Sequence, residues 1–394
     1  MTLFKNFNII KSGQILKNAS LLVEGGRIKH IGYNIPCDNA EVIDSNGELY
    51  LSAGFIDIHV HGGGGYDYMD ADAVEYAAIA KHHAKYGTTA LYPTTIAASR
   101  EELIDSLASF EIAKATAKSV IGGAKMLGIH LEGPYLAMSQ KGAMDPKYIR
   151  NPIPEEYEEL LSLSNDIKRM TIAPELDGAI ELGSYLYNRG VIPSIGHTDA
   201  ICEDIYRAYR DGNYRLMTHL YSAMSLTRRI GINRFAGVVE AAYLIDDMYV
   251  EAIADGIHLP KDLLQLIYKI KGADRIALIT DAMRASGMTE GTYILGSRKN
   301  GMECVVEDGV AKLPDKTAFA GSIATTDRLA RTMTKIAEVP LVSTIQMLTE
   351  TPAKIMNIFS ERGSLDIGKF ADIVAFDDDI NVKLTMVEGT VIGG

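Results

Sequence analysis

Histidines gather where short apolar segments of this 394-residue sequence end. Of the nine histidines, His30, His82 and His83 lie elsewhere. The other six close or follow apolar segments: His59, His61, His130, His197, His219 and His258. Because the neutral imidazole is the commonest metal ligand in proteins, this distribution indicates a metal centre.

The motif His59-Val60-His61 places two imidazoles one residue apart. On a β-strand, side chains at positions i and i+2 point to the same face, so both rings could bind one ion. The alternative is a pair of hydrogen-bonded core histidines. The segment SAGFID before the motif and the glycines after it favour the metal pair.

A second ligand set is spread further along the chain. Glu132 ends the apolar segment that begins at Met126, where a carboxylate is costly to bury unless it is paired or bound to a metal. His197 and His219 each close an apolar segment. One carboxylate with two imidazoles suits Zn²⁺ and similar ions and leaves a position for water. A salt bridge at Glu132 and two structural histidines are the alternative, and His130 is expected to be a hydrogen-bonding partner.

An acidic residue that could act as a base follows the apolar segment RIALIT. This residue, Asp281, would be a general base if it faced a water held by the metal, and a helix N-cap if it did not. In the same way, His258 in the segment Asp255-Gly256-Ile257-His258 is either a substrate contact or a buried hydrogen-bonding histidine.

Eight apolar segments carry these residues, and they alternate with longer helical stretches such as 70–86, 100–118 and 154–165. The segments read FIDIHV, TALYPT, MLGIHLEG, MTIAPE, VIPSIGH, RLMTHL, VEAIAD and RIALITDA. This alternation predicts a (β/α)₈ TIM-like barrel, whose active site lies at the carboxyl ends of its strands. A doubly wound open sheet is the alternative. It is disfavoured because Gly62–Gly65 lacks the spacing of a phosphate-binding turn and instead predicts a loop.

Both ends of the chain have the pattern of β-strands. SLLVEGGRIKHIG predicts a hairpin, and AEVIDSNGELYLSAG predicts a second one with its turn at Asn46-Gly47. The last segment, from KFADIVAF onward, is again rich in strand formers. We therefore expect an α/β protein with a small β-sandwich domain formed by both termini (residues 1–52 and 362–394) and a barrel at 53–361.

The composition excludes several classes of function. With 51 acidic and 39 basic residues, the net charge of −12 argues against binding to nucleic acid or to a membrane surface, but not against a small anionic ligand. The three cysteines, Cys37, Cys202 and Cys304, are odd in number and far apart, which is typical of reduced thiols in a cytoplasmic protein. We find neither a signal peptide nor an apolar run of about 18 residues.

Several motifs resemble one known family over essentially the whole chain. In order they are HLEGPY, IGHTDA, THLYSAM, IADGIHL, TDAMRASG, FAGS and GKFADIVAFD. They are similar to the N-acetylglucosamine-6-phosphate deacetylase family of the amidohydrolase superfamily. The resemblance implies that Glu132, His197 and His219 hold the main metal ion, that His59 and His61 hold a second one, and that Asp281 is the catalytic acid and base.

The reaction implied by the resemblance is metal-dependent hydrolysis of the N-acetyl group of N-acetylglucosamine 6-phosphate, which yields glucosamine 6-phosphate and acetate. We expect one or two divalent ions per subunit, zinc first, with Fe²⁺, Mn²⁺ and Co²⁺ as alternatives. The expected substrate contacts are Ala143, Met144, Ser222, Ala223, Asp255, His258, Phe319, Ala320 and Gly321. The family is typically a homodimer in which the partner subunit lends an arginine to the phosphate.

Three departures from the family pattern affect the substrate contacts. Met144 stands in KGAMDP where the family has a histidine, and Ser222 stands in SAM where the family has asparagine. The family's REPG has become RFAG at Arg234, after a longer loop that carries Arg228 and Arg229. These three arginines are the candidates for the phosphate, and a solvated loop is the alternative.

The departures leave other functions open. One is the deacetylation of a related N-acetylhexosamine phosphate, and another is the hydrolysis of a different amide. Cyclic-amide hydrolases are disfavoured because MTIAPELDG offers no lysine at the strand end. A non-catalytic sugar-binding relative is disfavoured because the metal ligands and Asp281 are all present.

Overall fold

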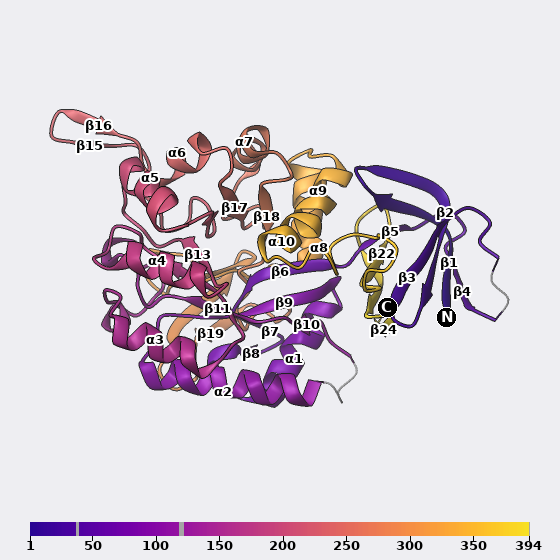
Figure 1. Ribbon diagram of the computed structural model, residues 1–394, viewed down its shortest axis with the longest axis horizontal. Helices are drawn as coiled ribbons and strands as arrows, with labels where there is room; N and C mark the ends of the chain where they lie inside the picture. The colour runs from indigo at the N-terminus through magenta and orange to yellow at the C-terminus, as the bar shows by residue number, and fades with distance from the viewer. Residues whose placement is uncertain (37–38, 118–121, 394) are drawn as a thin grey trace.

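The computed structural model describes residues 1–36, 39–117 and 122–393, and it has two parts. A barrel of parallel strands with helices around it forms the larger part, and a sheet that contains both termini lies beside it (Figure 1). The prediction of a TIM-like barrel with a smaller β domain from both termini is therefore confirmed. We expected that domain to be a β-sandwich, and its strands are linked in one eight-stranded sheet. The exact boundaries, 1–52, 53–361 and 362–394, remain our proposal.

Eight strands of the barrel pair in parallel with their neighbours. In spatial order they are β6 (Phe55–Val60), β9 (Thr88–Thr95), β11 (Ile129–Glu132), β12 (Ile167–Ile172), β13 (Ile192–Ile195), β14 (Leu216–Met217), β17 (Tyr249–Ala252) and β18 (Ile276–Leu278). The short β10 (Lys125–Met126) also pairs with β9. The ring closes between its first and last strands through a bridge from Val60 to Ala282 and a hydrogen bond from Asp281 N to His59 O (3.0 Å).

Helices follow the strands and cover the outside of the barrel (Figure 1). They are α1 (Ala73–Ala84), α2 (Arg100–Ala117), α3 (Pro154–Leu163), α4 (Ala179–Asn188), α5 (Cys202–Asp211), α6 (Val238–Leu244), α7 (Lys261–Lys271), α8 (Thr326–Arg331), α9 (Leu341–Leu348) and α10 (Glu350–Ile355). Four short helical turns add to them: η1 (Tyr68–Asp70), η2 (Met138–Gln140), η3 (Pro146–Tyr148) and η4 (Thr332–Ile336). The first three predicted helices correspond to α1, α2 and α3.

Three β elements interrupt this alternation. The arginine-bearing segment, expected as a loop, is an antiparallel hairpin of β15 (Arg228–Ile230) and β16 (Asn233–Phe235) that projects from the barrel (Figure 1). The glycine run, also expected as a loop, pairs β7 (Gly62–Gly63) with β8 (Tyr66–Asp67). The third was not expected from the sequence, and it is a meander of β19 (Gly291–Leu295), β20 (Met302–Glu307) and β21 (Val310–Lys312).

The sheet of the termini has the order β24-β23-β22-β5-β1-β2-β3, with β4 also paired to β1. Its strands are β1 (Thr2–Lys11), β2 (Gln14–Glu24), β3 (Arg27–Gly32), β4 (Glu41–Asp44), β5 (Tyr50–Ala53), β22 (Ile373–Phe376), β23 (Val382–Val387) and β24 (Thr390–Gly393). The N-terminal and C-terminal strands are joined into one sheet where β22 pairs with β5. A separate apolar core that includes Phe4, Phe7, Leu21 and Met386 packs within this part.

One of the two predicted hairpins is wrong. The β2–β3 hairpin forms, but β4 and β5 do not pair with each other. Both run parallel to β1, β4 along its first half and β5 along its second. An irregularity in β1 between Phe4 and Phe7 separates the two halves, so Asn46-Gly47 links two strands that share one neighbour.

Two smaller predictions concern the cysteines and the membrane. Cys202 and Cys304 are free thiols, and Cys37 lies outside the described residues. Among the residues that the structure describes, no helix combines the length and apolar character needed to cross a bilayer.

Candidate metal-dependent active site

Glu132, His197 and His219 meet at the carboxyl end of the barrel. Glu132 is the last residue of β11, and the two histidines follow β13 and β14. The His219 Nε2 atom lies 2.9 Å from Glu132 Oε1, and His197 Nε2 lies 3.2 Å from the same oxygen. The two Nε2 atoms are 3.2 Å apart, and all three side chains are buried. Residues separated by up to 87 positions therefore aim three metal-competent atoms at one point.

His59, His61 and Asp281 form a second buried group beside the first. The Nε2 atoms of His59 and His61 are 3.2 Å apart, and Asp281 Oδ1 lies 3.0 Å from His61 Nε2 and 3.4 Å from His59 Nε2. The groups adjoin at Glu132, whose Oε2 is 3.3 Å from His61 Nε2. The H-x-H pair thus faces the same space as the other ligands.

The carboxylates make the site strongly attractive to positive charge. Burial acts to raise the pKa of Glu132, but the surrounding imidazoles hold that pKa well below its usual range. Burial likewise acts to raise the pKa of Asp281, but His59 and His61 lower it. Burial acts to lower the pKa of His59, yet Glu132 and Asp281 raise it to about 9. Two ionised carboxylates inside a protein require compensating charge. Protons on His59 and His61 can supply it, and a divalent cation would displace those protons and take over their role.

The donor set fits such an ion. In each group, one carboxylate and two imidazoles offer atoms that lie within 4.8 Å of one another. Imidazole nitrogens and a carboxylate oxygen are ligands of zinc and of related divalent ions. The structure therefore has two buried groups consistent with divalent metal binding.

The backbone at the strand ends is strained in a way that aims these side chains. His197, His219 and Asp281 have φ values of 49°, 30° and 50°, in the left-handed region that residues other than glycine rarely adopt. Such conformations cost about 1–3 kcal/mol each and persist where the surrounding structure enforces them. For His197, the Nδ1 atom donates to the carbonyl of Gln140 (2.8 Å), which fixes the ring with Nε2 toward Glu132.

A cavity of about 530 Å³ opens onto the two groups, a size suited to a small metabolite. Twelve of the residues singled out in the sequence line it: His61, Glu132, Ala143, Met144, His197, His219, Ser222, Ala223, His258, Asp281, Phe319 and Gly321. Others were not expected: Ile96, Ser139, Gln140, Lys141, Gly142, Tyr221, Leu295, Thr317 and Ala318. Leu295 ends β19, so the meander that sequence reasoning missed contributes part of the wall.

Five expected substrate contacts and the predicted ligand His59 are absent from the lining. Two of the five, Asp255 and Ala320, lie next to residues that do line the cavity. Asp255 accepts a hydrogen bond from His258 Nδ1 (2.8 Å) and so orients the ring. The ring of Phe319 packs against that of His258, with 4.4 Å between the ring centroids. Ala320 is fully buried. Asp255 and Ala320 therefore support residues of the cavity wall.

None of the three arginines lines the cavity. Arg228 pairs with Asp199, which also accepts from the side chain of Gln140 (3.2 Å). Arg229 in β15 lies opposite Arg234 in β16 in the strand register of the exposed hairpin. The three arginines therefore lie outside the cavity that adjoins the metal groups.

The remaining histidines do not join the two groups. His130 is buried below them, between Thr94 Oγ1 (3.3 Å) and Thr171 Oγ1 (2.7 Å), as expected for a hydrogen-bonding partner. Burial lowers the pKa of His82 to about 3 and that of His83 to about 4, so both rings of α1 are neutral.

The sequence is similar to those of known proteins over most of its length. Residues 50–392 match the amidohydrolase family. The chain is 34% identical over 391 residues to the N-acetylglucosamine-6-phosphate deacetylase of Bacillus subtilis (strain 168), which covers 99% of this chain and 96% of that protein. It is 32% identical over 350 residues to the N-acetylgalactosamine-6-phosphate deacetylase of Escherichia coli O157:H7, which covers 88% and 89%.

A solved structure gives the same picture. The fold resembles that of a mutant N-acetyl-D-glucosamine-6-phosphate deacetylase from Mycobacterium smegmatis in complex with N-acetyl-D-glucosamine 6-phosphate. The TM-score is 0.89 at 28% identity, and the match covers 100% of this chain and 99% of that one.

Proposed function

This chain belongs to the amidohydrolase family, and within it to the N-acetylglucosamine-6-phosphate deacetylases, and from that premise we propose that its substrate is N-acetylglucosamine 6-phosphate. The products would be acetate and glucosamine 6-phosphate. The observation that carries the proposal is the convergence of Glu132, His197 and His219 with Asp281 at the wall of one cavity. An amide hydrolase needs a water nucleophile, a base and an acid at one place, and this arrangement provides them.

We assign the proton transfers to Asp281. When bound, the metal would supply a Lewis acid that makes water more acidic and polarises the amide carbonyl. The ionised carboxylate of Asp281 takes a proton from the water whose oxygen attacks the acetyl carbon. As the carbon–nitrogen bond breaks, Asp281 returns that proton to the leaving nitrogen. Its backbone is well held for this role, because its N–H donates to His59 O (3.0 Å) and its carbonyl accepts from Ser322 N (2.7 Å).

We propose that the phosphate end of the substrate lies against His258. The Nδ1 atom of this ring is occupied by Asp255, which leaves Nε2 available to the ligand. Ser222 and Ala223 line the same cavity and would contact the sugar phosphate beside it. Lys141 adds a positive charge to the lining.

We propose two metal ions per subunit, with zinc as the first choice. The supporting observation is that both ligand groups are complete. Met144 bears on the second ion, because a thioether cannot donate the hydrogen bond that the family histidine offers to a substrate oxygen. An ion held by His59 and His61 would supply that missing polarisation.

We also propose a homodimer, and the β15–β16 hairpin is the element that supports it. Ile232 at its tip is 88% exposed, and Ile230 is 49% exposed. An isolated two-stranded hairpin is marginally stable in water, so contact with a second subunit would both cover these side chains and hold the hairpin. Arg234, on this arm, would then reach the partner's phosphate site.

We place the protein in the cytoplasm, because its thiols Cys202 and Cys304 are free.

The second candidate for the substrate is the galactose epimer, N-acetylgalactosamine 6-phosphate. Ser222 is the residue that favours this second candidate, because its hydroxyl replaces the amide of the family's asparagine and so changes a contact to the sugar.

The test is acetate release from four substrates: the N-acetyl derivatives of glucosamine and galactosamine, each with and without the 6-phosphate. We expect the highest kcat/KM for N-acetylglucosamine 6-phosphate and a loss of at least about 100-fold without the phosphate, since charge-assisted bonds contribute about 1.5–3 kcal/mol each. A preference for the galactose epimer would replace the substrate, and no release from any of the four would overturn the proposal.

A further inference from the structure

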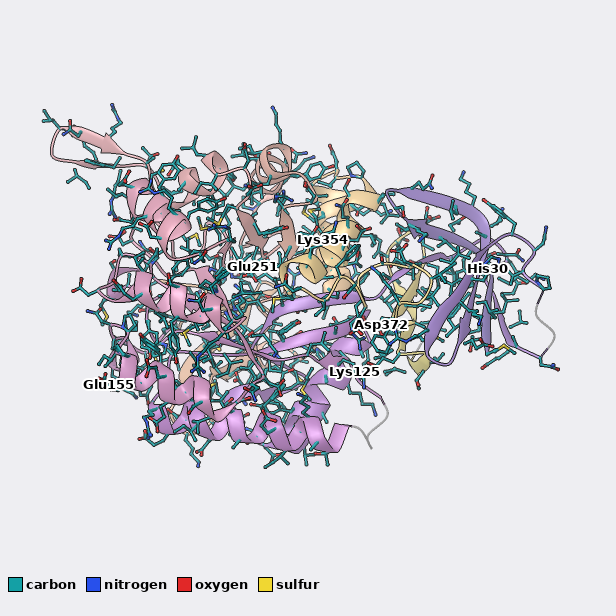
Figure 2. The ribbon with its side chains drawn as sticks, viewed as in Figure 1. His30, Lys125, Glu155, Glu251, Lys354 and Asp372 are labelled. Carbon is teal, nitrogen blue, oxygen red and sulfur yellow. The ribbon has the colours of Figure 1, made fainter. Side chains whose placement is uncertain are left out.

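A polar layer lies inside the barrel, immediately below the two metal groups. Barrel interiors are usually filled by branched apolar side chains. Here Arg169 of β12 and Glu251 of β17 are both fully buried, and Figure 2 shows Glu251 within the barrel. They form an ion pair through Arg169 Nη1 and Glu251 Oε1.

Arg169 is held on every side. Its Nε donates to Ser194 Oγ (2.9 Å), and its Nη2 donates to Thr218 Oγ1 (2.8 Å). Its Nη1 also donates to the carbonyl of Ile58 (3.3 Å) in β6, one residue before His59. The guanidinium therefore fixes Glu251 relative to β6, β13 and the residue that follows β14.

The second carboxylate oxygen of Glu251 contacts both metal groups. Oε2 lies 3.3 Å from His59 Nδ1 and accepts from the backbone N–H of His219 at 3.2 Å. His59 belongs to one group and His219 to the other. His219 is also the residue whose backbone has the strained φ of 30°.

Stability alone does not explain the pair. A buried ion pair contributes little net stability, because removing both charges from water offsets their attraction. Orienting a metal ligand is a different role, and carboxylates that accept from the second ring nitrogen of a histidine are known to perform it.

We propose that Glu251, held by Arg169, is a positioning residue of the metal centre. It keeps the proton of His59 on Nδ1, so that Nε2 presents a lone pair to an ion beside His61 and Asp281. It also anchors the His219 backbone in its left-handed conformation. The inference deepens the proposed function, because it rests on the two metal groups assigned there.

Glu251→Gln tests the proposal with little change in size. Arg169 contacts one carboxylate oxygen of Glu251 and His59 Nδ1 faces the other, so an amide, which has an oxygen at only one of these two positions, cannot accept from both. With its oxygen toward Arg169, its NH₂ group would face His59 and move the ring proton to Nε2. We expect the Zn²⁺ affinity of the His59 group to fall about 10–100-fold, as measured by chelator competition and metal content. We expect kcat to fall while KM for the sugar phosphate stays within about twofold, since Glu251 does not line the cavity.

A double variant keeps the test valid if Glu251→Gln folds poorly. Arg169→Met with Glu251→Leu removes both charges, so no uncompensated ion stays buried. We expect its thermal unfolding to stay close to that of the unchanged protein while the Zn²⁺ affinity still falls about 10–100-fold.

The matched control is Asp372→Asn, which breaks another buried arginine–carboxylate pair, with Arg362. Asp372 immediately precedes β22 of the smaller sheet, away from the centre of the barrel where Glu251 lies (Figure 2). We expect lower stability but unchanged Zn²⁺ affinity in this variant. Such a result separates loss of a buried pair in general from loss of the pair beneath the metals.

Two outcomes count against the inference, and they can be told apart. If Glu251→Gln and the double variant bind Zn²⁺ with the stoichiometry and affinity of the unchanged protein, the positioning role is overturned and the metal groups stand. If the unchanged protein binds no more Zn²⁺ than a His59→Asn variant, the assignment of an ion to the His59 group fails and the inference fails with it, while the Glu132 group stands.

Discussion

Asp281 is the residue on which the proposed chemistry depends. Its carboxylate lies 3.0 Å from His61 Nε2, and its pKa is held low by the two imidazoles beside it, so it is ionised and able to accept a proton. We expect Asp281→Asn to lower kcat by about 10²–10⁴-fold, the usual contribution of a general acid or base. Steady-state acetate release measures this change.

Metal content is the control for that variant. We expect the Glu132 group to keep its ion in Asp281→Asn, because Asp281 belongs to the other group. Full activity in a metal-loaded Asp281→Asn protein would contradict the role of the carboxylate.

His61 tests the second ion. We expect His61→Asn to bind about one equivalent of Zn²⁺ less and to lose about 100-fold or more in kcat, because Met144 cannot polarise the substrate in place of a Lewis acid. Elemental analysis after dialysis gives the stoichiometry. His30→Asn is the control, since it removes an exposed histidine of the smaller sheet (Figure 2). Unchanged metal content and kcat in His61→Asn would refute two-metal catalysis.

At this scale, the sequence indicated residues whose position is informative by itself. Glu132, His197 and His219 are polar residues that end apolar segments, which is where barrels build their sites. Arg169 and Glu251 lie inside strands, where a charged residue ordinarily points outward. Only the three-dimensional structure shows that both side chains point inward and meet.

At the scale of elements, the β15–β16 hairpin carries the clearest prediction. We expect Ile232→Ser to shift the protein from about twice 42.9 kDa toward the monomer in analytical ultracentrifugation, because the exposed tip would lose its apolar contact. Val74→Ser is the control, since Val74 is 78% exposed on α1. If Ile232→Ser dimerises as strongly as the unchanged protein, or if the unchanged protein is a monomer, the proposed role of the β15–β16 hairpin in a dimer is contradicted.

The sequence predicted elements well where local pattern decides them. Eight apolar segments and the helices between them were enough for the barrel. The pairing of β4 and β5 was wrong because a turn motif such as Asn46-Gly47 reports a change of direction and not the partner of each strand. The irregular β1 offers two separate edges, and long-range pairing of that kind has no local signal.

For the molecule as a whole, metal binding should be visible in stability. A ligand at 100 times its Kd adds about 2.7 kcal/mol to the folded state. With an unfolding entropy of about 2.1 cal/mol/K per residue, this gives a rise in Tm of about 3 °C for a chain of this length. Calorimetry with Zn²⁺ and with a chelator measures the difference. We expect Glu132→Gln to lose most of this rise in Tm. If Zn²⁺ raised the Tm of Glu132→Gln as much as that of the unchanged protein, the ion would bind elsewhere.

The most direct measurement is acetate release from N-acetylglucosamine 6-phosphate by the protein after its metal has been removed and then restored. We predict that a chelator abolishes acetate release and that Zn²⁺ restores it as the sites fill. We also predict that His219→Asn, which lacks a ligand of the main group, does not recover. Undiminished deacetylation by metal-free protein, or full recovery by His219→Asn, would contradict metal-dependent hydrolysis at this site.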